Sequence, residues 1–410
     1  VYSCEQSRLL SLVYTDNRLL AGAYRFAVEP MFAPTVSAVQ RGFLKGRSMN
    51  ANILEMELLT SSASLNHRRP AMVFYDFKAA FPSVNHNYIW KVLTAVGTSR
   101  SFLNAFKGFY RGNWQRILIR GTQSRLFLVS CGIGQGCPLS PLLFAVVIDV
   151  FLRRLHRRHL TITLRAFADD IGLVVQHISH LVAVQFDFLA FAKISGLHLN
   201  LPKTALVPLW ESTVAAVTHF VRDDYPCLAS MNVSFAAKYL GIWMGPKGAE
   251  YTWVEPLAKY QRAVRRWSQG SWGLHLATLV YNVYVSSILG FVAQFHAPPK
   301  EILDAEKNAL RSFVRGPRNW CSTAELFHLD TWLGFRYRFQ SIQAVSLAAR
   351  TRLSHCERKV VEVASGILRM TSLTRNTGGR AGTLGSTTLL STTLSKRSWT
   401  SATSDHHSPG

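Results

Sequence analysis

Three carboxylates at the ends of apolar segments constrain the fold of this 410-residue chain most strongly. Asp76 closes the apolar run 71–77, and Asp169 with Asp170 interrupts the apolar stretch from Leu164 to Val175. The first pattern is typical of a buried strand that ends in a charge, and the second is typical of a hairpin with the acids at its turn. Carboxylates at the edge of an apolar sheet are costly unless a cation offsets them. The sequence therefore predicts a sheet edge that binds divalent metal.

The segments around these acids predict an alternation of strands and helices. Ser140 as the N-cap and Pro141 at the first helical position predict a helix that ends near Arg158. Further helices are expected over 50–59, 88–96 and 182–195, and further strands over 116–129, 198–209 and 238–244. Residues 71–245 should form an α+β sheet domain. The chain from there to about residue 365 should be mainly helical.

The charge balance favours a polyanionic partner. Lys and Arg number 46 against 23 Asp and Glu, which gives a formal charge of +23. Such an excess indicates nucleic acid first and an anionic membrane surface second. A hydrophobic content of 48% is enough for a folded core. The six cysteines form no C-x-x-C pair, so we expect neither zinc nor a disulfide framework.

Two features bear on targeting. The chain begins with Val1, and charges at Glu5 and Arg8 interrupt any apolar run, so we expect no signal peptide and a start inside a longer reading frame. The segment from Leu276 to Phe295 has about the length of a bilayer span, but it contains Asn282 and other polar residues. We expect a buried helix there and no membrane partner.

Oxygen ligands favour Mg²⁺ or Mn²⁺ over zinc, and two such ions roughly 3.5–4 Å apart suit nucleotidyl transfer. A lone Asp-Asp pair is weak evidence, because such pairs are common in surface turns and a second one occurs at Asp223 and Asp224. The order of several segments along the chain is more specific. That order is Phe74-Tyr75-Asp76-Phe77-Lys78-Ala79-Ala80-Phe81, then Gly134-Gln135-Gly136-Cys137-Pro138-Leu139-Ser140-Pro141, then Phe167-Ala168-Asp169-Asp170.

These three segments resemble motifs A, B and C of reverse transcriptases. Segments 196–204 and 238–241 look like the following motifs D and E, and Gln40 to Ser48 resembles a fingers segment of non-LTR (LINE-type) retrotransposon enzymes. Residues 281–320 are similar to their thumb. The resemblance implies a right-hand polymerase with N-terminally truncated fingers (1–70), palm (71–245) and a thumb-like region (246–365). A Ser/Thr-rich tail (366–410) is expected to be disordered.

The resemblance also implies roles for single residues at the metal site. Asp76 and Asp169 would hold two Mg²⁺ ions (or Mn²⁺), with help from Asp170 and the carbonyl of Phe77. Lys203, in motif D, would donate a proton to the leaving pyrophosphate, although a solvated lysine is an equally good interpretation.

Nucleotide contacts follow from the same motifs. Phe81 occupies the position at which the family places an aromatic ring beneath the sugar, where the ring would collide with a 2′-hydroxyl and so select deoxynucleotides. The alternative is that Phe81 is an ordinary core aromatic. Gln135 and Gly136 resemble the residues that touch the incoming nucleotide and the template.

Basic residues supply candidate nucleic-acid contacts. In the fingers segment and before it, Arg18, Arg41, Lys45 and Arg47 are candidates for template or triphosphate, and Lys259, Arg262, Arg265 and Arg266 are candidates for a duplex. Arg153, Arg154, Arg157 and Arg158 form a third basic set that we also consider for the duplex. Asp149 lies four residues before Arg153, and we interpret it as a helical ion pair and not as part of the site.

The leading hypothesis is an RNA-directed DNA polymerase of a non-LTR element, with RNA template, DNA primer and dNTPs as partners. We expect it to act inside the cell, in the nucleus at the site of integration. Two alternatives remain open: a decayed element copy that only binds nucleic acid, and a group II intron-type reverse transcriptase.

Overall fold

The computed structural model describes residues 14–314, 316, 320–358 and 362, and these residues form two compact units. The sheet unit comprises the described residues up to 52 together with 66–234. The helical unit comprises 53–65 and the described residues from 235 onward. The first thirteen residues of the predicted fingers and the whole predicted tail lie outside the described residues.

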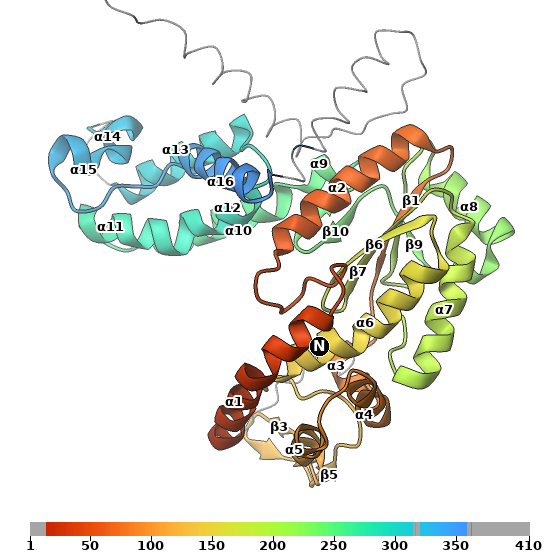
Figure 1. Ribbon diagram of the computed structural model, residues 1–410. Coiled ribbons are helices and arrows are strands. Elements are labelled where there is room, and N and C mark those ends of the chain that lie inside the picture. The colour runs from red at the N-terminus through yellow and green to blue at the C-terminus, as the bar shows by residue number, and fades with distance from the viewer. Residues whose placement is uncertain (1–13, 315, 317–319, 359–361, 363–410) are drawn as a thin grey trace, which may run out of the picture. The chain divides into compact units, whose positions relative to one another are not determined.

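A five-stranded sheet forms the centre of the sheet unit (Figure 1). Its strands are β6 (Ile162–Phe167), β7 (Asp170–Val175), β1 (Ala71–Tyr75), β8 (Ala205–Pro208) and β9 (Asn232–Val233), in that spatial order. All neighbours are antiparallel except β8 and β9. Every residue of β1 is buried, as expected for a central strand that is covered on both faces.

Helices α6 (Ser140–Arg158) and α7 (His180–Ser195) pack against this sheet. Tyr75 of β1 stacks on Phe188 of α7 with ring centroids 4.3 Å apart, and Phe151 of α6 stacks on Phe191 of α7 at 4.2 Å. Further elements of the unit are α1 (Thr15–Phe32), η2 (Ala33–Thr35), the first residues of α2 (Met49–Asn66), α3 (Ala80–Ser83), α4 (His86–Ala95), α5 (Arg100–Tyr110), α8 (Val214–Asp224) and η3 (Pro226–Leu228). The predicted 116–129 pairing appears as two short ladders, β2 (Trp114–Gln115) with β5 (Phe127–Leu128) and β3 (Leu118–Ile119) with β4 (Thr122–Gln123).

The helical unit opens, after the α2 segment, with a hairpin of β10 (Ala237–Tyr239) and β11 (Ile242–Met244). Its helices are α9 (Gly248–Tyr251), α10 (Val254–Trp267), α11 (Leu274–Val280), the π-helix η4 (Tyr281–Ser286), α12 (Ser287–Ala293), α13 (Lys300–Phe313), α14 (Thr323–Phe327), α15 (Leu329–Leu333) and α16 (Ile342–Cys356). The continuous helix 274–293 is long and apolar enough for a membrane span, and half of its most apolar window is buried inside the structure. Tyr281 and Leu289 from this helix belong to the buried core of the unit, which fits a core helix.

The α+β fold class is confirmed, with three local corrections. Residues 15–32 form a long helix, whereas the sequence suggested only short apolar stretches and loops there. The helix after motif B begins at Ser140 with Leu139 as its N-cap, because the Ser140 hydroxyl donates to the Gly134 carbonyl at 2.6 Å instead of capping. The expected strand 198–209 is interrupted at Pro202, which lacks an N–H for the ladder, so only 205–208 form β8.

Candidate active site

The strand register brings the three predicted acids to one edge of the sheet. Tyr75 of β1 pairs with Ile171 of the antiparallel strand β7, so Asp76, which follows Tyr75, lies beside Asp170, which precedes Ile171. Phe167 pairs with Asp170 across the β6–β7 hairpin, which leaves Ala168 and Asp169 as its two-residue turn. Asp76 and Asp169 are half-buried, and Asp170 is exposed. The backbone of two segments almost one hundred residues apart therefore meets at this edge of the sheet, where all three acids lie.

The carbonyl of Phe77 points toward the same edge. The carbonyl of Asp76 and the N–H of Lys78 bond to segment 198–200 at 2.8 Å each. Successive residues of a strand direct their backbone groups to opposite sides, so the carbonyl of Phe77 faces the β7 side. This direction fits the predicted role of that carbonyl as an additional oxygen ligand.

The predicted metal ligands fit a hard divalent cation in donor chemistry, since all of them are oxygens at one sheet edge. No group of three His, Cys, Asp or Glu side chains encloses a metal site within the part of the chain that the structure describes. Because carboxylates repel one another, the fold alone does not need to draw Asp76, Asp169 and Asp170 together.

Phe81 lies in an aromatic cluster beside the motif B loop. Its ring stacks on Phe144 of α6 with centroids 4.4 Å apart, and Phe43 approaches it edge-on at 6.3 Å. Phe43 also contacts Phe167, the residue before the motif C turn, at 6.2 Å. We call Phe43, Phe81, Phe144 and Phe167 the aromatic cluster. Phe43 is 40% exposed, and the sequence did not single it out.

The motif B loop is tied to the backbone around Phe81. The N–H of Ile133 donates to the Phe81 carbonyl, and the N–H of Gly132 donates to the Val84 carbonyl, both at 2.7 Å. Gly132 has a φ of +90°, and an added Cβ would lie 2.4 Å from the Pro82 carbonyl oxygen, so this close approach requires glycine. After Gly134 come Gln135, which is half-buried, and Gly136, which is exposed. The structure therefore brings motifs A and B together.

Lys203 lies in the turn before β8, where its N–H donates to the Asn200 carbonyl at 3.0 Å and its side chain is exposed. Asn200 in turn bonds to the carbonyl of Asp76. The structure thus connects the motif D turn with motif A through the backbone. The proton-donor role of Lys203 remains a prediction.

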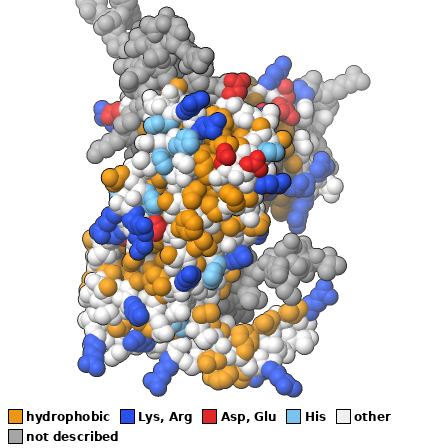
Figure 2. Space-filling view, turned by 90° about the vertical axis from the view of Figure 1, so that its right-hand side faces the viewer, with side chains coloured by type: hydrophobic (Ala, Val, Ile, Leu, Met, Phe, Trp, Pro, Cys, Tyr) orange, Lys and Arg blue, Asp and Glu red, His pale blue; other side chains and the backbone are white. Residues whose placement is uncertain are grey.

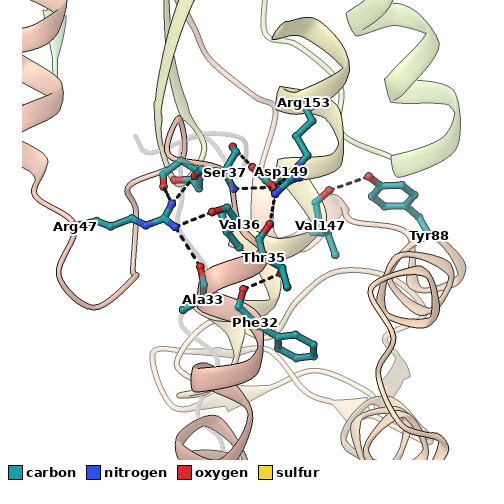
Figure 3. Close-up of polar contacts among 11 residues, drawn as sticks. Phe32, Ala33, Thr35, Val36, Ser37, Arg47, Tyr88, Val147, Asp149 and Arg153 are labelled. Atoms are coloured by element: carbon teal, nitrogen blue, oxygen red, sulfur yellow. Dashed lines mark hydrogen bonds and ion pairs between the residues drawn. The ribbon is translucent and has the colours of Figure 1, made fainter. Parts of the chain in front are cut away.

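Arg47 has a structural role that the sequence did not predict (Figure 3). Its guanidinium donates to four backbone carbonyls, those of Ala33, Val36, Ser37 and Gln40. These contacts account for most of its donors, so Arg47 organises the loop that carries Gln40 to Leu44. Of the other basic candidates near this loop, Arg18 and Lys45 are exposed, and Arg41 donates to the Asn52 side chain at 3.0 Å.

The interpretation of Asp149 as a structural acid agrees with its contacts. Asp149 accepts from the Arg153 Nε at 2.6 Å, as the i,i+4 spacing indicated, and it also accepts from the N–H of Ser37 at 3.1 Å and from the Ser37 hydroxyl (Figure 3). Arg153 donates in addition to the Thr35 carbonyl. The carboxylate therefore attaches the loop before Gln40 to α6.

Two other arginines of α6, Arg154 and Arg158, pair with a buried acid. Asp187 of α7, only 4% exposed at its side chain, pairs with Arg158 at 2.6 Å, His159 at 2.7 Å and Arg154 at 3.4 Å. A buried carboxylate needs such partners. Arg154 and Arg158 therefore form an ionic clamp between α6 and α7, which the sequence did not predict, and their contact with a duplex stays a prediction.

In the helical unit, the α10 candidates differ from one another. Lys259 pairs with Glu255 at 2.6 Å, and Glu255 also accepts from Lys238 at 2.7 Å, which holds the pKa of this exposed carboxyl at about 2. Arg262, Arg265 and Arg266 are exposed. Beside them, Trp267 stacks on the half-exposed Tyr284 with centroids 4.7 Å apart. Trp267 is partly buried against the core of the unit and Tyr284 is exposed, and aromatic rings beside cations are typical of nucleic-acid surfaces.

Surface charge adds to this pattern. On the face shown in Figure 2, Lys and Arg side chains outnumber Asp and Glu, and they surround a broad area of hydrophobic side chains. This face agrees with the net charge of the whole chain.

Comparison with known families identifies the chain. Residues 3–244 match the model of the family described as reverse transcriptase (RNA-dependent DNA polymerase). The chain belongs to the reverse transcriptase family. The match includes the three acids, the motif B loop and the motif D turn, and with it the right-hand polymerase class is confirmed for this chain. Members of this family generally use a divalent metal.

Curated relatives of this reverse transcriptase come from transposable elements. The uncharacterized 149 kDa protein of transposon TX1 of Xenopus laevis is 23% identical over 77% of this chain and 25% of its own length. The Pol polyprotein of the R2DM element of Drosophila melanogaster is 29% identical over 50% of this chain and 20% of its length. That of an R2 element of Popillia japonica is 26% identical over 60% and 36%. The predicted resemblance to non-LTR elements is confirmed, and the chain spans about a fifth to a third of these relatives.

Among solved structures, telomerase from Candida Tropicalis in complex with a TWJ fragment of telomeric RNA is similar to this chain. The TM-score is 0.45 with 11% identity, over 85% of this reverse transcriptase and 57% of the telomerase chain. The apo form of the same telomerase gives a TM-score of 0.42.

Proposed function

We propose that this chain is an RNA-directed DNA polymerase of a non-LTR retrotransposon. It would extend the 3′-hydroxyl of a DNA primer with dNTPs on an RNA template. The observation that carries the proposal is the pairing of β1 with β7, which brings Asp76 beside the turn that holds Asp169 and Asp170. Membership of the reverse transcriptase family supports it.

The residues of motifs A and C would bind the metal ions and select the sugar of the incoming nucleotide. Two Mg²⁺ or Mn²⁺ ions at Asp76, Asp169, Asp170 and the Phe77 carbonyl would activate the primer hydroxyl and stabilise the charge that develops on the phosphates. The ring of Phe81 bounds the sugar pocket and excludes a 2′-hydroxyl. Its stacking on Phe144 supports this role, because a ring fixed on one face cannot swing aside.

The remaining candidates would bind the polyanions. Gln135 and Gly136 would contact the incoming nucleotide, and the exposed Lys203 would donate a proton to pyrophosphate. The exposed arginines 262, 265 and 266 would hold the duplex by its phosphates. We place this activity in the nucleus, at the site of integration.

Primer extension tests the proposal directly. The purified protein with Mg²⁺, a primed RNA template and dNTPs should extend the primer, and Asp169→Asn should abolish extension. Asp224→Asn is a matched control, because it alters the other Asp-Asp pair of the chain, at the end of α8. Equal extension by the Asp169 variant would remove the assignment. Salt-sensitive binding of the template without any incorporation would identify a decayed copy that only binds nucleic acid.

A further inference from the structure

The turn that carries Asp169 and Asp170 adopts an unfavourable backbone conformation. Ala168, its first residue, has a φ of +58° and is 2% exposed. For a residue with a Cβ this left-handed region is sterically unfavourable. The two-residue β6–β7 hairpin favours a positive φ at this position, and contacts to the backbone of Ala168 can stabilise it further.

The side chain of Gln40 makes the contacts that do so. Its Oε1 accepts from the N–H of Ala168 at 2.8 Å, and its Nε2 donates to the carbonyl of the same residue at 3.0 Å. Oε1 also accepts from the N–H of Gly42 at 2.8 Å. Two N–H donors on one side and a carbonyl on the other fix the orientation of the amide. Gln40 is fully buried, so water does not compete for these bonds.

Gln40 is itself held firmly against the sheet. The N–H of Arg41 donates to the Ala166 carbonyl at 2.9 Å, and the N–H of Ala166 donates to the Val39 carbonyl at 3.0 Å. The loop thus continues the sheet beyond the edge strand β6 in parallel register. Gly42 allows this approach, because an added Cβ there would lie 2.2 Å from the Ala168 nitrogen.

We propose that Gln40 is a positioning residue, whose amide holds Ala168 in its left-handed conformation and thereby sets the direction of the two following carboxylates. The contribution to catalysis rests on the proposed polymerase function. The contribution to the turn conformation does not, because it depends only on the hydrogen bonds to Ala168. Rotation of the turn would displace Asp169 and strain the neighbouring Phe167–Asp170 pair at the end of the ladder, and a displacement of about 1 Å lowers a rate about 10²-fold.

The experiment compares Gln40→Met, which keeps the length of the side chain and removes its three hydrogen bonds to Ala168 and Gly42, with Gln185→Met, which alters a buried glutamine on α7. Hydrogen exchange at the Ala168 amide should accelerate at least about tenfold in the Gln40 variant and stay unchanged in the control, since loss of one buried hydrogen bond opens the amide to water. This readout needs neither metal nor substrate.

Primer extension provides the second readout. In Gln40→Met, kcat should fall about 10- to 100-fold while KM for dNTP stays within about threefold, because the acids and not the nucleotide pocket are displaced. Adding Ala168→Gly should recover about tenfold of this loss, since glycine adopts positive φ without penalty. Gln40→Glu, which keeps the acceptor and loses the donor, should show intermediate protection of the Ala168 amide, and it covers the case in which the Met variant does not fold.

The possible outcomes are distinguishable. Unchanged Ala168 exchange in Gln40→Met would overturn the proposal, as would a loss of kcat that Ala168→Gly does not relieve. If the parent protein extends no primer but the Ala168 amide exchanges faster in Gln40→Met, the role of Gln40 at the turn is supported. The failure to extend the primer would then count only against the proposed function.

Discussion

Two buried titratable groups in the helical unit should give its stability an unusual pH dependence. Glu306 of α13 is 4% exposed, and burial raises the pKa of its carboxyl from 4.5 to about 7, although the Ile342 N–H donates to it at 2.7 Å. His296 is 8% exposed, and burial together with Arg350 lowers the pKa of its imidazole from 6.5 to about 4. Each difference corresponds to about 3 kcal/mol.

The two groups act in opposite directions. Between pH 4.5 and 7 the folded chain binds the Glu306 proton more tightly than the unfolded chain, so this contribution to stability is lost as pH rises. Between pH 6.5 and 4 the unfolded chain binds the His296 proton more tightly, so the contribution of neutral His296 is lost as pH falls. The two slopes should largely cancel from about pH 4.5 to 6.5.

Glu306→Gln removes one slope and keeps the acceptor for the Ile342 N–H. Relative to the parent, its free energy of unfolding should rise by about 3 kcal/mol between pH 4 and 8. His296→Gln should do the reverse: relative to the parent, it should gain about 3 kcal/mol as pH falls from 7 to 4. Urea unfolding, followed by tryptophan fluorescence at each pH, measures both. The difference from the parent cancels other titrating groups. A Glu306→Gln variant with the pH profile of the parent would refute the reasoning.

Three further predictions concern the sheet unit. Phe81→Val should raise the incorporation of ribonucleotides relative to deoxynucleotides at least about tenfold in competition assays, and unchanged sugar selection would show that the Phe81 ring does not exclude the 2′-hydroxyl. Arg47→Lys should lower the free energy of unfolding by about 3 kcal/mol, because an ammonium cannot reach four carbonyls, whereas Lys45→Ala at an exposed neighbour should change it by less than about 0.5 kcal/mol. Asp187→Asn should lower the free energy of unfolding by about 2 kcal/mol, a modest loss because the arginine partners of Asp187 are exposed to solvent. An unaltered urea midpoint would contradict the clamp between α6 and α7.

Patterns that act over a few residues predicted the central elements well. The apolar stretch from Leu164 to Val175 forms a hairpin with the acids at its turn, and α6 ends at Arg158 as expected. Gly196, at a φ of +80°, ends α7 because glycine adopts the left-handed C-cap without strain. Such signals are carried by neighbouring residues and need no knowledge of tertiary contacts.

Contacts between distant segments escaped prediction. Gln40 and Ala168 are 128 residues apart, and Asp187 and Arg158 are 29 apart, so no local pattern announces either pair. The signal of Arg47 was ambiguous, since a basic residue in a predicted fingers loop fits phosphate contact as well as backbone contact. Polar side chains that bond to backbone atoms depend on the path of the chain, which the sequence pattern does not show.

The loop between Ser37 and Arg47 contacts two parts of the proposed active site, the turn that carries the acids and the aromatic cluster. Gln40 holds the turn that carries the acids, and Phe43 contacts both Phe81 and Phe167. Arg47 stabilises the loop by donating to the Gln40 carbonyl. Because one loop contacts both the turn that carries the acids and the aromatic cluster, a change that loosens this loop should lower the rate of primer extension and the selectivity for deoxynucleotides together. Phe81→Val leaves this loop intact, so it should change the selection of the sugar without lowering the rate through the turn. A comparison with Arg47→Lys therefore separates the effect of the Phe81 ring from the effect of the loop that holds it.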